Sequence, residues 1–255
     1  MVKPSLILTF GLLVPTVAGA APPTVVGHVQ ITRPDNLALA NARAIWIPSS
    51  TPEALIEQLG PHWARREGAA VFVELEKERP RPEATLPEAY LASTFVVDHA
   101  EPAIAQRVVE LKAKHGDLPK VADIESFVAS FVEPNYKSLF SVASTVAREG
   151  SGDCTEYAVL LCALLRATGR PARVVIGVLI ADLSEAMIAQ NHAWVEYWRE
   201  GAWHPLDASP LAARSEITTL ALPFGRISNE GPSWRIGMMS IYEALPGQLE
   251  LRGAP

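Results

Sequence analysis

The sequence from Gly152 to Leu165 reads Gly-Asp-Cys-Thr-Glu-Tyr-Ala-Val-Leu-Leu-Cys-Ala-Leu-Leu. Its apolar residues recur at the spacing of one helix face, at Tyr157, Leu160, Leu161, Leu164 and Leu165. Gly169 and Pro171 follow and predict the end of that helix. We therefore expect Cys154 in the first turn of a buried helix, where free backbone N–H groups and the helix dipole stabilise an anion. A thiol in that position loses its proton more easily, and the thiolate is a nucleophile.

Three strands are expected after this helix, over residues 172–180, 191–198 and 201–207. The second strand carries His192 near its start, and the third ends at Asp207. A cysteine, a histidine and an aspartate, placed on a helix and two strands, are the parts of a nucleophile, a base and a group that orients the base.

Four motifs carry a family resemblance, and they occur in a fixed order. They are Gly-Asp-Cys-x-Glu at 152–156, Ala-Leu-Leu-Arg-Ala-x-Gly-x-Pro-Ala-Arg-Val-Val-x-Gly at 163–177, His-Ala-Trp-Val-Glu at 192–196 and Trp-x-Pro-Leu-Asp at 203–207. Together they resemble the transglutaminase-like superfamily of cysteine enzymes, over roughly residues 98–210. The resemblance implies a papain-like core in which Cys154 is the nucleophile, His192 the base and Asp207 the residue that orients the base.

Each candidate also has a structural interpretation. Cys162 fits a small buried hydrophobe, whereas Cys154 follows a Gly-Asp turn and precedes a polar threonine. His204 is the rival base, but the family pattern does not mark it and its strand position is expected to be exposed. Asp207 is also consistent with an aspartate that closes a strand.

Four further residues match the family pattern or lie within it, and we interpret them as structural. Glu156 and Arg173 are expected to pair with each other or with Arg166. Trp194 and Trp203 are expected in the core or in the wall of the cleft.

A zinc site is the first competing interpretation, with Cys154, His192, His204 and Asp207 as ligands. The chain has no Cys-x-x-Cys or His-x-x-x-His pair, and thiolate activation explains the same residues with fewer assumptions. No Asp-x-Asp-x-Asp-Gly calcium loop occurs. We therefore predict neither a metal nor a cofactor.

Composition limits the class of protein and its partners. The chain has 255 residues, of which 49% are apolar and 20% charged, as in ordinary globular proteins. Its net charge is −6 and it has no block of basic residues, so no nucleic-acid partner is expected. The charge says little about the substrate, but the family resemblance implies a protein or peptide. The sequence gives no indication of the oligomeric state.

The first residues resemble an export signal. Lys3 precedes an apolar run at 6–14, and Ala18-Gly19-Ala20 forms a small-x-small cleavage site. The alternative is an uncleaved anchor helix, but the run is short and Pro15 breaks it. We predict a signal peptide at 1–20, a periplasmic or secreted protein, and no stable membrane span after cleavage.

An exported chain with two cysteines raises the question of a disulfide. Cys154 and Cys162 are eight residues apart on one expected helix, which separates their Cα atoms by ~12 Å. A disulfide tolerates at most about 7 Å, so both thiols are expected to be free.

The order of elements predicts an α+β fold, with helices first and an antiparallel sheet after them. Residues 21–97 are expected to form a small N-terminal α+β unit, with strands near 24–32, 42–47 and 71–75 and a helix from Pro52 to Gly60. A proline-rich linker at 79–87 separates this unit from a catalytic core at 98–222. Within the core we expect helices near 101–116, 119–134 and 140–148, and a rim or lid at 181–190. A C-terminal extension at 223–255 is expected to contain a last strand at 234–242.

The sequence thus predicts a cysteine-dependent acyl transfer on peptide or isopeptide amides through a thioester. Water is favoured over a lysine amine as the acceptor, because nothing in the sequence indicates a lysine-binding groove. The alternative is an inactive transglutaminase-like module for binding or assembly.

Overall fold

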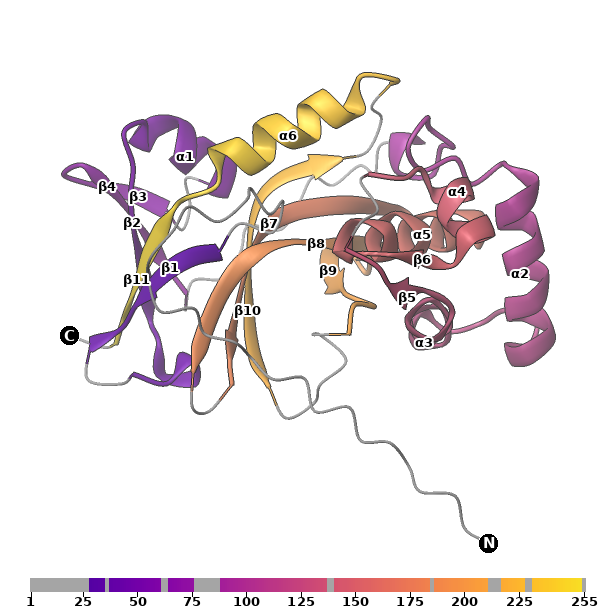
Figure 1. Ribbon diagram of the computed structural model, residues 1–255, viewed down its shortest axis with the longest axis horizontal. Helices are drawn as coiled ribbons and strands as arrows, with labels where there is room; N and C mark the ends of the chain where they lie inside the picture. The colour runs from indigo at the N-terminus through magenta and orange to yellow at the C-terminus, as the bar shows by residue number, and fades with distance from the viewer. Residues whose placement is uncertain are drawn as a thin grey trace, which may run out of the picture.

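The computed structural model describes residues 28–34, 37–60, 64–75, 88–136, 140–183, 186–210, 217–227 and 231–253. The expected signal peptide at 1–20 and the whole of the expected linker at 79–87 lie outside these residues. The fold is α+β, as expected, with a group of helices on one side of a strongly curled sheet (Figure 1).

One sheet of nine strands runs through the described part of the chain, in the order β10-β7-β8-β1-β11-β2-β4-β3, and β9 also pairs with β8. The strands are β1 (His28–Thr32), β2 (Ala44–Pro48), β3 (Ala64–Glu67), β4 (Ala70–Glu74), β7 (Ala172–Asp182), β8 (Met187–Arg199), β9 (Ala202–Leu206), β10 (Thr218–Ile227) and β11 (Gln248–Arg252). Neighbouring strands are antiparallel except β1 and β11, which are parallel. A separate short parallel pair joins β5 (Glu133–Pro134) to β6 (Ser151–Gly152).

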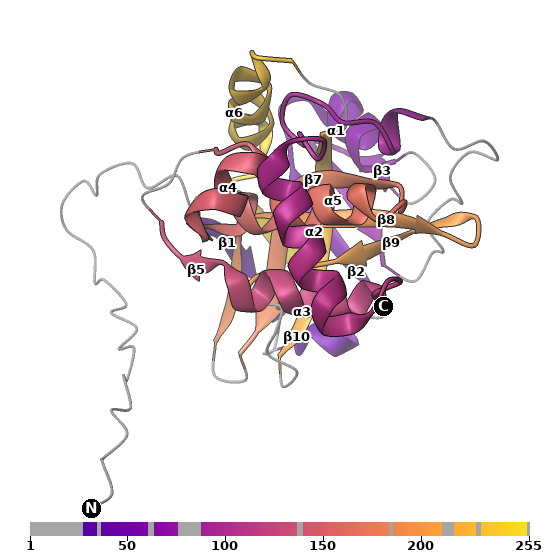
Figure 2. The same cartoon turned by 90° about the vertical axis from the view of Figure 1, so that its right-hand side faces the viewer.

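The helix α5 (Cys154–Ala167) forms the centre of the helical layer, and its residues from Thr155 to Arg166 are all buried. It packs against α2 (Pro102–His115), α3 (Val121–Phe131) and α4 (Ala143–Glu149) on one side and against β7 and β8 on the other (Figures 1 and 2). The remaining helices are α1 (Pro52–Leu59), α6 (Trp234–Ala244) and the 3-10 turns η2 (Leu39–Asn41) and η3 (Glu88–Tyr90). Within the described ranges, no helix combines the length and the apolar character needed to cross a membrane.

The N-terminal unit shares the sheet of the catalytic core. The strand β1 pairs with β8 on one side and with β11 on the other, so it joins the two halves of the sheet. A second apolar core lies beneath this junction, where Val178, Ile180 and Leu222 pack with Ile45 and other residues of the N-terminal strands. The boundary near residue 97 therefore separates elements along the chain without separating the sheet.

Two expectations for single elements are wrong. The segment 181–190 is not the long loop that was expected to form a rim or lid, because most of it belongs to β7 and β8, where Asp182 pairs with Met187. The segment 234–242 is a helix and not a strand, since Trp234, Met238 and Ile241 follow helical spacing and all contact the cores. The last strand is β11, and the strands β3 and β10 were not expected from the sequence.

Candidate active site

The start of α5 is fixed by a capping box around Cys154. Asp153 is the N-cap residue and accepts a hydrogen bond from the Thr155 N–H at 2.8 Å. Glu156 closes the box, because its Oε2 accepts the Asp153 N–H at 3.0 Å. Cys154 is therefore the first residue of the helix, as expected, and its side chain is partly exposed.

Gly152 packs closely against Glu156 just before the start of this helix. A Cβ atom on Gly152 would lie 2.1 Å from the Cβ of Glu156, so no other residue fits there. The second carboxylate oxygen of Glu156 accepts the Ser141 N–H at 2.8 Å. Burial, followed by the negative charge of Asp153, raises the pKa of Glu156 to about 7.

The pairing of β8 with β9 brings His192 and Asp207 together. Val195 lies opposite Leu206 in this antiparallel pair, so the next residue of the chain, Asp207, follows on the side of Trp194. Trp194 and His192 are two residues apart in β8 and therefore share a face of the sheet. The Nε2 atom of His192 lies 2.6 Å from Oδ2 of Asp207. The other oxygen of Asp207 accepts the Ser209 N–H at 2.9 Å, which fixes the carboxylate in place.

The charge state of His192 results from opposing effects. Burial lowers its pKa and is the largest single effect, but the charge and hydrogen bond of Asp207, followed by Cys154, raise it to about 10. Burial likewise raises the pKa of Asp207, yet the facing His192 outweighs burial and holds it below its usual value. The pair is therefore an imidazolium and a carboxylate at neutral pH. Although Cys154 is close enough to affect the ring, the buried Nδ1 makes no hydrogen bond of normal geometry with a described residue.

Two hollows meet at His192. The first, of about 130 Å³, is lined by Cys154, His192, Gln190 and Tyr136, among others. The second, of about 280 Å³, is lined by His192 and Asp207 but not by Cys154. Trp194 forms part of its wall and stacks on the His192 ring, with centroids 6.3 Å apart.

The other residues considered from the sequence lie away from this point. Cys162 is fully buried, and neither it nor Cys154 forms a disulfide. The Nε2 of His204 is 3.2 Å from the carbonyl oxygen of Arg199 on the exposed side of the β8–β9 hairpin. Of the four zinc ligands considered above, His204 therefore lies apart from the other three. Within the described residues, no group of three or more histidine, cysteine or acidic side chains is arranged to hold a metal.

The expected pairing of Glu156 with Arg173 is wrong. Arg173 donates two hydrogen bonds to Oε2 of Glu196, at 2.9 and 2.6 Å, and its guanidinium lies 3.9 Å from the centre of the Trp203 ring. Arg166 donates to the carbonyl oxygens of Ala172 and Ala92, at 2.9 and 2.8 Å. Arg166 thus connects α5 to β7, and Arg173 connects β7 to β8.

Two residues near the site were missed from the sequence. Glu125 of α3 lines the second hollow beside Asp207, and burial, followed by the nearby Asp207 charge, raises its pKa despite a hydrogen bond from the Asp207 N–H. Tyr242 of α6 lies with its hydroxyl 3.4 Å from Oγ1 of Thr155. Neither belongs to a local motif, so no signal in the sequence pointed to them.

Comparisons with known proteins find relatives that match part of the chain. A segment of 74 residues is 40% identical to a protein-glutamine gamma-glutamyltransferase of Pseudomonas aeruginosa, and it covers 26% of this chain but only 11% of that protein. A solved structure of a proposed cysteine protease from Cytophaga hutchinsonii is 20% identical, with a TM-score of 0.41 over 62% of this chain and 63% of that one.

The periplasmic domain of TgpA from Pseudomonas aeruginosa is 25% identical, with a TM-score of 0.38 over 55% of this chain and 52% of that chain. The family model described as the transglutaminase-like superfamily matches residues 102–208, which run from the start of α2 to just beyond Asp207. Residues 102–208 of this chain, which include Cys154, His192 and Asp207, are thus similar to the transglutaminase-like superfamily.

Proposed function

We propose that this protein is a cysteine enzyme that cleaves peptide or isopeptide amides through a thioester on Cys154. One observation carries the proposal. A cysteine at the start of a buried helix lines the same cavity as a histidine whose far nitrogen is bound to an aspartate at 2.6 Å. This is the geometry of a nucleophile, a base and a group that orients the base.

The first step forms the thioester. The Cys154 thiolate attacks the amide carbonyl, and the Cys154 N–H, free in the first turn of α5, donates to the oxyanion. The C–N bond then breaks, and protonated His192 gives its proton to the leaving amine. A pKa of about 10 keeps His192 protonated for this step at neutral pH.

The second step reverses the role of His192. Once the sulfur is acylated it carries no charge, so one of the effects that raise the His192 pKa is lost. Neutral His192 then takes a proton from water, the hydroxide adds to the thioester carbonyl, and the C–S bond breaks. The products are a carboxylic acid and the Cys154 thiolate beside a protonated His192.

We favour water over an amine as the acceptor. An acceptor must reach the ring nitrogen that faces Cys154, because the other nitrogen is bound to Asp207. The hollow beside Cys154 is the smaller of the two, and the larger one lies beside Asp207. One relative is named as a gamma-glutamyltransferase, so an amine acceptor belongs in the test.

The test has two parts. Iodoacetamide labelling of the folded protein, read by mass spectrometry at each cysteine, should modify Cys154 rapidly at pH 7, and His192→Asn should slow this reaction. At alkaline pH the two rates should converge, since the thiol then ionises without a partner. Equal rates at pH 7 would contradict the proposal and favour an inactive binding module.

The second part identifies the acceptor. Peptides that contain glutamine or an isopeptide bond are incubated with the protein, with and without a primary alkylamine. Cys154→Ser serves as the inactive control. Hydrolysis adds the mass of water across the cleaved amide, whereas transfer adds the amine, and an exclusive amine product would overturn the preference for water.

We also propose that the protein is exported. The support is the charged, apolar and small-residue pattern of residues 1–20. N-terminal sequencing of the protein from its native cell should begin at Ala21, in the periplasmic or extracellular fraction. A chain that retains Met1 in the cytosolic fraction would contradict this.

A further inference from the structure

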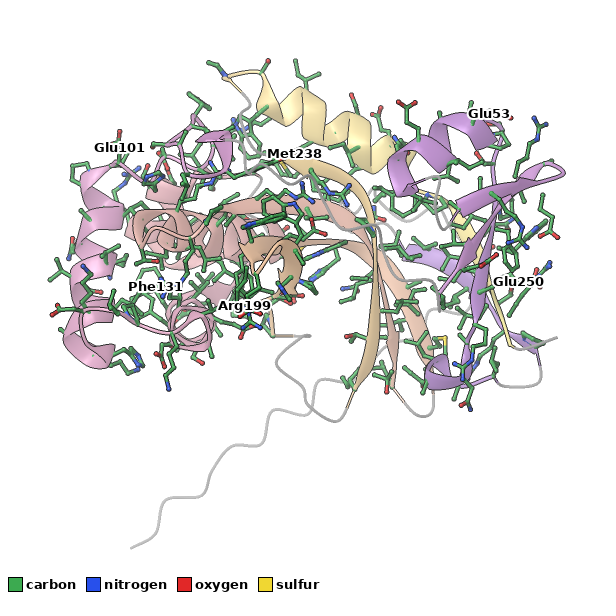
Figure 3. All side chains as sticks on the ribbon, turned by 180° about the vertical axis from the view of Figure 1, so that it is seen from behind. Glu53, Glu101, Phe131, Arg199, Met238 and Glu250 are labelled. Carbon is green, nitrogen blue, oxygen red and sulfur yellow. The ribbon has the colours of Figure 1, made fainter. Side chains whose placement is uncertain are left out.

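The helix α6 lies outside the residues that match the family, yet it is built into the catalytic core. Trp234 and Met238 are 2% and 1% exposed in the core around α5, and Figure 3 shows Met238 on the side of α6 that faces the sheet. Ile241 contacts both apolar cores. A Cβ on Gly225 of β10 would lie 2.6 Å from the Cδ1 of Ile241, so glycine at this position allows α6 to pack closely on the sheet.

The last turn of α6 reaches the first turn of α5. The Tyr242 hydroxyl lies 3.4 Å from Oγ1 of Thr155, which is 1% exposed and directly follows Cys154. Burial, followed by the negative charges of Cys154, Asp153 and Glu156, raises the pKa of Tyr242 well above its usual range. The phenol therefore keeps its proton and can donate it to a neighbouring oxygen.

A second connection runs through Phe140. The Tyr242 ring stacks on the Phe140 ring, with centroids 6.0 Å apart, and Arg235 donates two hydrogen bonds to the Phe140 carbonyl oxygen, at 3.2 and 3.1 Å. These contacts hold Phe140 at a φ of 55°, a conformation rare for residues other than glycine. The next N–H, from Ser141, donates to Glu156 in the capping box of α5.

We infer that Tyr242 is a positioning residue for the nucleophile, which holds the first turn of α5 so that Cys154 faces His192. This rests on the proposed role of Cys154. Tyr242 is not among the residues that line the cavity, so it acts through Thr155 and Phe140 and not on the substrate. The enzyme thus depends on an element that lies outside its family-matched region.

The test measures iodoacetamide alkylation of Cys154 at pH 7 in the full chain. Tyr242→Phe keeps the ring stack and removes only the hydroxyl, so it should slow alkylation by about three- to tenfold, the range of one hydrogen bond, with little change in Tm. Thr155→Val should slow it equally. Because both changes remove the same bond, the double variant should be no slower than either single variant.

The matched control is Ile104→Val on α2, at a fully buried site on another element of the same core. It should lower Tm slightly and leave the alkylation rate unchanged, which separates positioning from general loss of stability. If Tyr242→Phe is alkylated at the wild-type rate, or if the rate losses of the two single variants multiply in the double variant, this inference is wrong. The proposed function would not be affected. If His192→Asn also alkylates at the wild-type rate, the proposed function fails, and this inference fails with it.

Discussion

His192 is held between burial, which favours the neutral ring, and Asp207, which favours the charged ring. The folded-state pKa of about 10 lies above the ordinary 6.5, so the ring is charged below about pH 10. Its contribution to stability is complete below pH 6.5 and is lost as the pH rises from 6.5 to about 10. We expect the ¹³Cε1 NMR signal of His192, identified by its absence in His192→Asn, to titrate near pH 10.

Asp207→Asn should move that midpoint down by about 1–3 pH units, since it removes the facing charge and leaves burial in place. The signals of the other histidines give an internal control, because their surroundings do not change. A midpoint that stays the same in Asp207→Asn would show that Asp207 does not set the charge of the ring.

Gly152 offers a second test at the scale of one residue. Gly152→Ala would place its Cβ 2.1 Å from the Cβ of Glu156, so the free energy of unfolding should fall by about 1–3 kcal/mol or more, as for an overpacked core. Gly237→Ala is the matched control, since nothing lies within 4 Å of its Cβ and it sits inside α6. That variant should gain about 0.4–1 kcal/mol in urea unfolding. Equal effects of the two changes would contradict the packing argument.

The residues of the candidate site differ in how far they were predictable. Cys154, His192 and Asp207 stand in local motifs, where helix start, strand and strand end are readable from neighbouring residues. Glu125 and Tyr242 reach the site from α3 and α6, and only tertiary packing brings them there. Their own segments carry no mark of that contact, so single-sequence reasoning could not find them.

The capping box of α5 should make the stability of the protein depend on pH. Glu156 is fully buried, and its pKa is raised to about 7 from 4.5. The folded state therefore holds a proton that the unfolded chain releases, so stability is complete below pH 4.5 and declines as the pH rises to about 7. The decline should amount to about 3 kcal/mol relative to Glu156→Gln, which does not titrate.

Chemical denaturation at closely spaced pH values measures this difference. The free energy of unfolding of Glu156→Gln should differ from that of the wild type by an additional amount that does not depend on pH. The reason is that its amide nitrogen cannot accept a hydrogen bond from one of the two backbone N–H groups. Parallel pH profiles for the two proteins would show that Glu156 is ionised in the folded protein across the whole range.

The elements that the sequence missed also have physical explanations. The strand β10 contains Pro223 and Gly225, which usually interrupt a strand, but here the register against β7 shifts between them and accommodates both. We expected a strand at 234–242, but the apolar residues of this segment have helical spacing. The segment forms a helix because that spacing lets one apolar face pack against both cores. The helices α2 and α5 were predicted well, since caps and period agree with their burial.

For the whole molecule, the question is whether the predicted core at 98–222 can fold without the rest of the chain. Val178, Ile180 and Leu222 are fully buried by the N-terminal strands, and α6 covers the catalytic sheet. A fragment of residues 98–222 would expose these surfaces. It should therefore show no near-UV circular dichroism signal and no cooperative thermal transition, while a chain of residues 28–253 should melt in one step. A sharp transition in the fragment would establish an independent domain.

The strand β1 lies parallel to β11, and Thr32 donates from Oγ1 to the carbonyl oxygen of Leu249, across 217 positions of the chain. The same strand pairs with β8 at Gln190, two residues before His192. During synthesis, β1 emerges long before either partner exists, and it has to wait unpaired while most of the chain is translated. Contacts of such high sequence separation make folding slow, so β1 can complete its pairing between β8 and β11 only after residue 252 has been translated.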